Sequence, residues 1–183
     1  MTQRRRPTKA ECLAAHGRLV PDVIGTGLKI LFCGINPGLY TAAIGYHFGR
    51  PGNRFWKALY LGGLTPRVLA PEEVEAFRAL GYGITNVVAR ATAGAAELGT
   101  EEMRAGAQVL VRKVKRDRPR VVAVLGVGAY RVGFDRPDAT VGEQEGIGES
   151  RVWVLPNPSG LNAHYTVERL GEAFGEMRRA SGV

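Results

Sequence analysis

The stretch from Lys29 to Gly38, KILFCGINPG, decides how this chain folds. Its apolar part, Ile30 to Gly34, has the length and composition of a strand buried on both faces, which is typical of a parallel sheet. The strand stops abruptly in the turn Asn36-Pro37-Gly38. In an open α/β sheet, the loops that follow the carboxyl ends of the strands line the ligand cleft. We therefore expect Asn36 to be the first side chain that the sheet presents to a ligand.

A second segment, near the C-terminus, repeats this arrangement. Arg151 to Leu155 is another apolar strand, and it ends in the turn Pro156-Asn157-Pro158-Ser159-Gly160. Taken singly, each Asn-Pro pair is an ordinary opening of a turn. Because both turns follow strands and would lie on the same rim of the sheet, the pair predicts two walls of one cleft.

Length and composition favour one domain with a full core. The chain has 183 residues, of which 45% are hydrophobic, and this argues against disorder. We predict a flexible basic arm at residues 1–9 and a single domain over residues 10–183. Lys and Arg number 25 against 17 acidic residues, a net charge of +8 that indicates a polyanionic partner. Nucleic acid is favoured over a membrane surface, although surplus arginine can also reflect a compositional bias.

Cysteine and histidine usage excludes several classes of site. The two cysteines, Cys12 and Cys33, are too few for a disulfide framework, a four-cysteine iron–sulfur cluster or a zinc ribbon. Cys33 is expected to be a small buried hydrophobe. The histidines, His16, His47 and His164, lack metal-ligand spacing, so we expect no metal and no cofactor. Without a long apolar run or a signal peptide, the expected location is the cytoplasm.

Strands and helices alternate along the chain. The predicted strands are residues 30–34, 83–88, 121–125 and 151–155, and the predicted helices are residues 11–17, 54–61, 71–80, 100–117 and, capped by Thr166, a last one ending near residue 180. The alternation predicts an α/β fold with a mostly parallel, four-stranded sheet. Residues 37–52 are predicted to form a long functional loop. Residues 135–148 are a connection, rich in glycine and charge, that could contain a hairpin.

The expected cleft offers amides where many hydrolases have a nucleophile and a base. The sequence contains no G-x-S-x-G elbow, no Walker loop and no HExxH motif. An amide does not titrate near neutral pH, so Asn36 cannot be a strong general base, but it can orient a water molecule. Such a site suits a reaction whose leaving group departs largely on its own while the protein supplies position and charge stabilisation.

Four motifs together resemble the mismatch-specific uracil-DNA glycosylases and the related thymine-DNA glycosylases. They are GINPG at 34–38, NRFWK at 53–57, GITN at 83–86 and NPSGLN at 157–162, and their order and spacing match from about residue 27 onward. The resemblance implies a three-layer uracil-DNA glycosylase fold. It also implies a monomeric enzyme that flips uracil, or a related damaged pyrimidine opposite guanine, out of double-stranded DNA and hydrolyses its N-glycosidic bond to leave an abasic site.

The resemblance assigns roles in the base pocket. Asn36 matches the asparagine that positions water, and Phe48 matches the aromatic residue that stacks on the extruded base. Backbone groups of Ile35 and Phe48 match those that bond to the edge of the base, and Asn86 matches a polar group behind it. The pocket implied in this way consists of Ile35, Gly38, Thr41, Phe48, Asn86 and Ala93.

The resemblance also assigns a DNA wedge to the second turn. Leu161 would enter the base stack where the target nucleotide has left, and backbone groups of Gly160 and Asn162 would read the orphaned guanine. Asn157 and Ser159 belong to the same DNA-contacting turn. An inserted apolar side chain offsets the cost of unstacking, which is lower for a mismatched pair.

The sequence departs from the family pattern in two places. Relatives often carry arginine two residues after the wedge leucine, where this chain has Ala163, followed by His164 and Tyr165 as possible substitutes. The small residues of the segment 91–96, ATAGAA, are expected to lie near the pocket without supplying a side chain that acts, and Ala93 in particular would make the pocket roomier.

Two other functions compete with this interpretation. One is a module that binds mismatches or uracil-like bases without cleaving them. The other is a flavodoxin-like, nucleotide-binding enzyme that uses Gly126-Val127-Gly128, although that dinucleotide fingerprint is incomplete and tight helix packing explains its glycines better. Iron–sulfur uracil-DNA glycosylases are disfavoured by the cysteine count.

Overall fold

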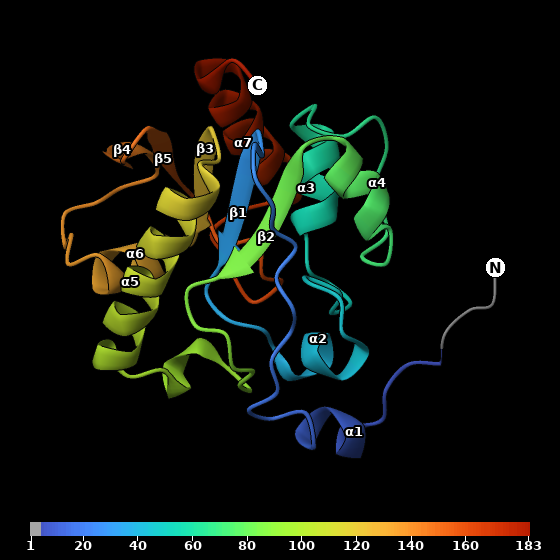
Figure 1. Ribbon diagram of the computed structural model, residues 1–183. Helices are drawn as coiled ribbons and strands as arrows, with labels where there is room; N and C mark the ends of the chain where they lie inside the picture. Colours follow the sequence, from blue (N-terminus) through green and yellow to red (C-terminus); the bar gives the residue numbers. More distant parts are fainter. Residues whose placement is uncertain (1–4) are drawn as a thin grey trace.

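A five-stranded sheet forms the centre of the protein, for which a computed structural model describes residues 5–183. The strand order is β2-β1-β3-β5-β4 (Figure 1). The bounds are β1 Ile30–Gly34, β2 Tyr82–Asn86, β3 Val121–Leu125, β4 Gly142–Ile147 and β5 Ser150–Leu155. All neighbouring strands are parallel except β4, which pairs antiparallel with β5. The α/β class and the four predicted parallel strands are therefore confirmed.

The prediction of four strands in all was wrong, because β4 is a fifth. Its sequence, GEQEGI, is exposed or half-buried at every position, and it pairs on one side only. Glycine and glutamate are poor strand formers, so local sequence gives little strand signal. The sequence allows a hairpin within residues 135–148, and the structure has a hairpin whose first strand, β4, lies there. Charged side chains such as those of β4 are a common way to protect an edge strand from pairing with other chains.

Helices cover both faces of the sheet (Figure 1). One face packs against α3, α4 and α7, and the other against α5 and α6. Their bounds are α3 Phe55–Leu61, α4 Val74–Ala79, α5 Thr100–Asp117, α6 Val127–Gly133 and α7 Val167–Ser181. Alternate residues of β1 serve the two faces: Ile30 and Phe32 enter the first core cluster, Leu31 and Cys33 the second. Burial raises the pKa of the Cys33 thiol, as expected for a small buried hydrophobe.

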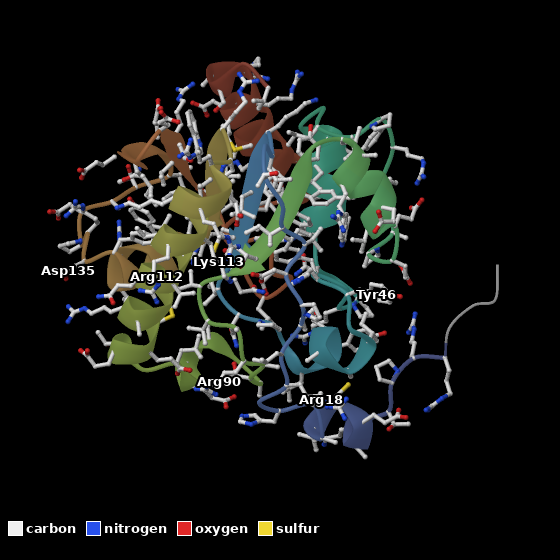
Figure 2. The ribbon with its side chains drawn as sticks, in the orientation of Figure 1. Arg18, Tyr46, Arg90, Arg112, Lys113 and Asp135 are labelled. Carbon is white, nitrogen blue, oxygen red and sulfur yellow. The ribbon has the colours of Figure 1, made fainter. Side chains whose placement is uncertain are left out.

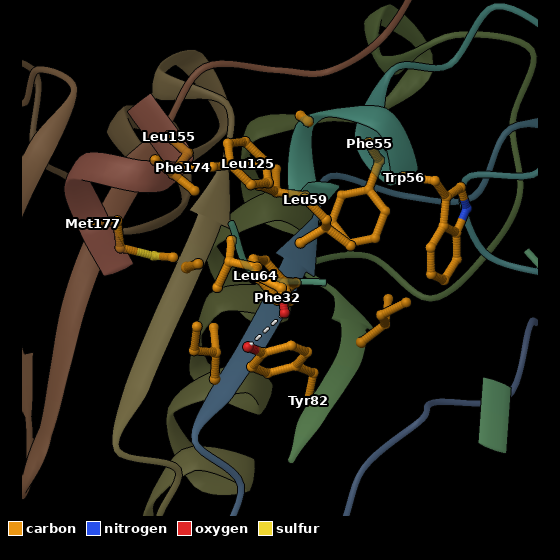
Figure 3. Close-up of a cluster of buried hydrophobic side chains, with 14 of the residues drawn as sticks. Phe32, Phe55, Trp56, Leu59, Leu64, Tyr82, Leu125, Leu155, Phe174 and Met177 are labelled. Atoms are coloured by element: carbon orange, nitrogen blue, oxygen red, sulfur yellow. Dashed lines mark hydrogen bonds between the residues drawn. The ribbon is translucent and has the colours of Figure 1, made fainter. Parts of the chain in front are cut away.

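Aromatic rings dominate the first core cluster (Figure 3). The Phe32 ring packs edge-on against Phe55 at 5.3 Å and stacks with Phe174 at 6.0 Å, joining β1 to α3 and α7. The buried Tyr82 hydroxyl donates to the carbonyl oxygen of Leu64 at 3.0 Å, the bond drawn dashed in Figure 3. These contacts hold the sheet and the helices of this face in a fixed relation.

Short helices account for most differences from the predicted elements. The segment 37–52 contains α2, Leu39–Ile44, so the prediction of an unstructured loop there was wrong. A helix of six residues, ended by Gly45 in the left-handed conformation, is too short to reveal itself by periodicity. The N-terminal helix α1, Lys9–Leu13, is capped by Thr8, and a short 3₁₀ helix, η1, covers Ala95–Glu97.

Other helix boundaries shift by a few residues. The helix α4 begins at Val74 rather than at residue 71, and α3 begins at Phe55, whose N–H donates to Asn53 Oδ1 at 3.0 Å. Thr166 caps α7 as predicted. The first four residues of the predicted basic arm lie outside the described residues. Among the helices within residues 5–183, none has both the length and the apolarity needed to cross a membrane.

Glycines let α3 and α7 approach each other closely. A Cβ on Gly171 would lie 2.5 Å from the Cβ of Leu61, and one on Gly62 would lie 2.9 Å from the Cβ of Phe174. Neither contact is compatible with a real side chain, so both glycines are needed for this helix crossing.

We expect Gly171→Ala to lower the free energy of unfolding by about 1–3 kcal/mol, because the added methyl group must push the helices apart. Gly128→Ala is the matched control: it is also helical but has no atom within 4 Å of the new Cβ. The control should raise the free energy of unfolding by up to about 1 kcal/mol through helix propensity alone. Urea unfolding followed by circular dichroism measures both, and equal effects would contradict the close crossing.

Candidate active site

A cavity of about 360 Å³ opens at the carboxyl ends of the strands, and it joins the two Asn-Pro turns. The turns follow β1 and β5, which are separated in the sheet by β3. The cleft with two walls is therefore present. The structure brings to this cavity eleven of the twelve predicted site residues: Ile35, Asn36, Gly38, Thr41, Phe48, Asn86, Ala93, Asn157, Ser159, Leu161 and Asn162.

Gly160 is the predicted site residue that does not line the cavity. A Cβ at this position would meet the carbonyl oxygen of Gly52 at 2.6 Å. The glycine is therefore required for close packing of its turn against the segment that precedes α3.

The Asn36 amide is held in one orientation. Its Nδ2 donates to Thr92 Oγ1 at 2.7 Å and to the carbonyl oxygens of Arg90 and Pro37, both at 3.2 Å. An amide nitrogen has only two N–H groups, so these acceptors occupy its donor capacity. Among the described residues, none donates to Asn36 Oδ1. The carbonyl side of the amide is thus left as a fixed acceptor at the cavity.

Thr92 was missed by the sequence analysis, which expected no acting side chain in the segment 91–96. Its hydroxyl, on a residue only 1% exposed, donates to the carbonyl oxygen of Gly94 at 2.8 Å and so turns a lone pair toward Asn36. The backbone N–H of Thr92 donates to the carbonyl of Pro37 at 3.1 Å. The only feature of the sequence that could have indicated Thr92 is its hydroxyl, which stands alone in a run of small residues after a strand.

A hydrogen bond between His16 and Glu97 and an ion pair between Arg90 and Glu102 hold the segment that carries Thr92. Glu97 Oε1 accepts from the N–H groups of Ala93 and Gly94 at 2.8 and 3.2 Å, while its Oε2 lies 2.9 Å from His16 Nε2. The bond to His16 is the largest cause that lowers the pKa of Glu97. Arg90 forms a two-bond pair with Glu102 at 2.6 and 2.8 Å. The partners of Asn36 are therefore fixed from the side away from the cavity.

His47 and Asn86 form a second fixed pair. His47 Nε2 lies 2.9 Å from the Pro21 carbonyl oxygen, which can only accept, so Nε2 carries the proton. Nδ1 is then the acceptor for Asn86 Nδ2 at 3.4 Å. Burial lowers the pKa of His47, outweighing the Pro21 bond and the Asp22 charge, so the ring is neutral at pH 7. Asn86 lines the cavity, and its Oδ1 is 2.6 Å from where a Cβ on Gly34, another lining residue, would lie.

A half-buried charge cluster fixes the segment that contains Pro21. Lys113 projects from α5 toward the strands (Figure 2), and its Nζ donates to Asp22 Oδ2 at 2.5 Å and Thr85 Oγ1 at 3.1 Å. The Thr85 hydroxyl donates to the other oxygen of Asp22 at 2.9 Å. Because Asp22 follows Pro21, this cluster positions the carbonyl that selects the His47 tautomer.

Phe48 forms an aromatic wall of the cavity. Its ring stacks on Phe55 at 4.1 Å with an interplanar angle of 27°. The backbone has a positive φ of 54°, a strained conformation for a bulky residue. Gly34 faces the ring, since a Cβ there would meet Phe48 Cζ at 3.2 Å. The core thus supports one face of the ring while the ring borders the cavity.

The turn after β5 presents an exposed leucine. Leu161 is 76% exposed, the largest exposed fraction among the large hydrophobic residues that the structure describes. Asn157 Oδ1 accepts from the Ser159 N–H, and Asn162 Nδ2 donates to the Asn157 carbonyl, both at 2.9 Å. Tyr165 packs against the first core cluster, whereas His164 is exposed. His164 is thus the more accessible of the two.

The electrostatic character of the cavity is neutral to positive. Among its described lining residues there is no Asp or Glu, and only His47 and Arg50 can carry charge. Figure 2 shows Arg18 and Arg90 at the same end of the molecule as α1 and α2. Within residues 5–183, no group of three or more His, Cys, Asp or Glu side chains could hold a metal ion.

The sequence model of the uracil DNA glycosylase superfamily matches residues 21–178. The chain belongs to this superfamily. Its class of activity is therefore that of a DNA glycosylase, a hydrolase of DNA repair, and its partner is DNA. The solution NMR structure of a candidate uracil DNA glycosylase from Methanosarcina acetivorans matches with a TM-score of 0.62 at 21% identity, covering 89% of this chain and 97% of that one. That likeness shows the shared fold.

The region matched by the superfamily model contains Gly126 and Gly128, the two glycines of the incomplete dinucleotide-binding fingerprint in this glycosylase. Gly126 has a φ of 129° and lies close to Ile35, whose Cδ1 would be 3.3 Å from an added Cβ. Gly128 has no atom within 4 Å of such a Cβ. Close packing therefore explains Gly126 but not Gly128.

We expect Thr92→Val in this glycosylase to lower the rate of base release about tenfold, because Asn36 loses a fixed acceptor while the shape of the side chain is kept. Thr92→Ser should restore most of the rate. Thr65→Val is a matched control, since it removes a hydroxyl-to-carbonyl bond of 2.8 Å that does not border the cavity. Single-turnover kinetics on a uracil-containing duplex measures all three variants. An unchanged rate in Thr92→Val would contradict the role of Thr92 in orienting the Asn36 amide.

We expect the His47 ring to titrate below its ordinary value of 6.5, because burial lowers its pKa. The unfolded chain then takes up this proton first as the pH falls. The contribution of neutral His47 to the free energy of unfolding is complete above about pH 6.5, and it is lost as the pH falls through the pKa of the folded protein. NMR titration of the histidine rings, with His47→Gln to identify the signal, measures the value. A His47 pKa at or above 6.5 would contradict burial as the dominant influence on this ring.

Proposed function

We propose that this protein is a glycosylase that removes uracil, and related damaged pyrimidines, from G:U mismatches in duplex DNA. The observation that carries the proposal is the oriented Asn36 amide, whose donors are occupied, whose Oδ1 accepts no bond from the described residues, and which lines the cavity shared with the Leu161 turn. We also propose that it acts as a monomer. We also propose that residues 10–183 act as one domain.

The base would enter between Phe48 and the two fixed amides. Stacking on the Phe48 ring uses the face that is not covered by Phe55. Asn86 Oδ1 can accept from the N3–H of uracil, because the neutral His47 ring holds the amide in that orientation. Backbone groups of Ile35 and Phe48 complete the contacts with the edge of the base. Gly38, Thr41 and the small Ala93 leave room around it.

The proposed chemistry is dissociative hydrolysis. The bond between C1′ and N1 breaks, its electron pair leaves with the base as an anion, and an oxocarbenium-like sugar remains. Asn36 Oδ1 accepts a hydrogen bond from a water molecule whose oxygen then bonds to C1′, and the proton released passes to solvent or to the departed base. The absence of acidic residues among the described lining agrees with this scheme, since no side chain is positioned to protonate the leaving group.

Mismatch preference would come from the turn after β5. Leu161, already exposed, can insert into the stack when the target nucleotide leaves. Asn157 and Ser159 hold the turn, from which backbone groups of Gly160 and Asn162 would contact the unpaired guanine. Opening a mismatch costs less than opening a paired base, so the same inserted area selects mismatched sites.

We expect Asn36→Ala to lower the single-turnover rate on a G:U duplex by about 10²–10³-fold, the usual effect of removing one preorganised polar group. Alkaline cleavage of a labelled duplex measures abasic-site formation directly. Affinity for a duplex carrying an abasic-site analogue serves as the control, and it should change little because the DNA-contacting turn is intact.

Two results would refute the proposal. Near-normal excision by Asn36→Ala would remove the amide from the mechanism. Tight binding of G:U duplex by the wild-type chain without any abasic product would favour the non-catalytic module instead. Excision from G:U and A:U duplexes at equal rates would leave a uracil glycosylase but would remove the mismatch preference.

A further inference from the structure

The Arg54 side chain is devoted entirely to backbone carbonyls of the turn that carries Leu161. Its Nη2 donates to the carbonyl oxygens of Ser159 at 2.5 Å and Asn162 at 2.9 Å. Its Nη1 donates to the Tyr165 carbonyl, and its Nε lies 3.4 Å from the carbonyl of Pro158. The backbone N–H of Arg54 also donates to Pro158, at 3.0 Å. One residue at the start of α3 thus contacts both ends and the middle of the turn.

No carboxylate competes for this guanidinium. Among the ion pairs between described residues, none involves Arg54. A guanidinium has five N–H groups in a rigid planar fork, and here the fork spans carbonyls that lie up to seven positions apart in the sequence, from Pro158 to Tyr165. The positive charge therefore strengthens bonds to neutral acceptors without being neutralised.

The turn has few other supports. Between β5 and α7, residues 156–166 contain no helix or strand. Apart from Thr166, which caps α7, its remaining side-chain bonds are internal to the turn: those of Asn157 and Asn162, and a bond of 3.3 Å from the Leu161 N–H to Ser159 Oγ. Internal bonds fix the shape of a turn but not its place on the protein. Packing of Tyr165 against the core and of Gly160 against Gly52 places the turn in part. Arg54 adds the direct polar link to its backbone from outside the turn, because α3 is anchored in the core through Phe55.

We propose that Arg54 is the positioning residue of the DNA wedge. It holds the turn so that Leu161 stands beside the cavity before DNA arrives, and opening the duplex then requires no rearrangement of the turn. This inference rests on the proposed wedge function of Leu161 and adds a residue to it that does not line the cavity.

The decisive comparison is Arg54→Lys on two substrates. Lysine keeps the charge but has a single ammonium group, which cannot reach carbonyls on both sides of the turn. We expect single-turnover excision from a G:U duplex to fall at least about tenfold, while excision from a single-stranded uracil oligonucleotide, where no stack must be opened, stays within about threefold of wild type. Leu161→Ala, measured in parallel, should show the same pattern.

Arg131→Lys is the matched control for the loss of an arginine-to-carbonyl bond. Arg131 Nε donates to the Ala139 carbonyl at 2.8 Å, in a loop that does not border the cavity. This variant should excise uracil from both substrates at the wild-type rate.

A fluorescent 2-aminopurine beside the target uracil adds a second readout, since its emission should rise less with Arg54→Lys than with wild type when the duplex is bound.

Chemical rescue separates positioning from folding. Arg54→Ala removes the fork, and added guanidinium ion should restore duplex excision toward the wild-type rate, whereas ammonium ion at the same concentration should not. A merely structural defect would not respond differently to the two cations.

The outcomes distinguish the failure of each proposal. If the wild-type chain releases uracil from neither substrate, the proposed function itself fails. If wild type is active and Arg54→Lys matches it on duplex DNA, the positioning role is overturned while the function stands. Equal losses on duplex and single strands would show that Arg54 supports the fold or the base pocket, and that outcome would also overturn the inference.

Discussion

The orientation of one amide is the constraint on which the rest of the site depends. Asn36 can act as a fixed acceptor only because Thr92 and the Arg90 carbonyl occupy its donors. Those partners come from a segment that follows β2, while Asn36 follows β1, so the geometry exists only when these two parallel strands are in register. The pairing of Gly34 with Asn86 sets that register at the cavity itself. Sheet formation and assembly of the site are thus a single event.

Charged groups support both sides of the cavity without entering it. On the base side, the chain of contacts runs from Lys113 through Asp22 and the Pro21 carbonyl to His47, and it ends in the orientation of Asn86. On the other side, Arg54 holds the Leu161 turn through backbone carbonyls. Polar groups fixed in this way require no reorganisation when substrate binds, which is the usual basis of electrostatic preorganisation. The acid-free lining suits a polyanionic partner and a net charge of +8.

Sequence patterns picked out residues that line one cavity, because that cavity lies at strand ends. Asn36 and Asn157 follow the two apolar runs that most clearly read as buried strands, and both line the cavity. Patterns failed where an element gets its stability from its neighbours. The strand β4 is glycine- and glutamate-rich and exists because β5 offers it hydrogen bonds. The six-residue α2 is likewise too short for its periodicity to be recognised.

By itself, the sequence determined the α/β class, the parallel strands and the four motifs, because burial and turn chemistry are local properties of residue type. Only the tertiary structure decided which small polar groups meet. Thr92 is one hydroxyl in a run of alanine and glycine, and nothing in that run indicates that it faces Asn36, 56 positions away. The same holds for Arg54, whose carbonyl partners lie more than 100 positions further along the chain. Such contacts arise from the packing of distant segments, which local propensity does not encode.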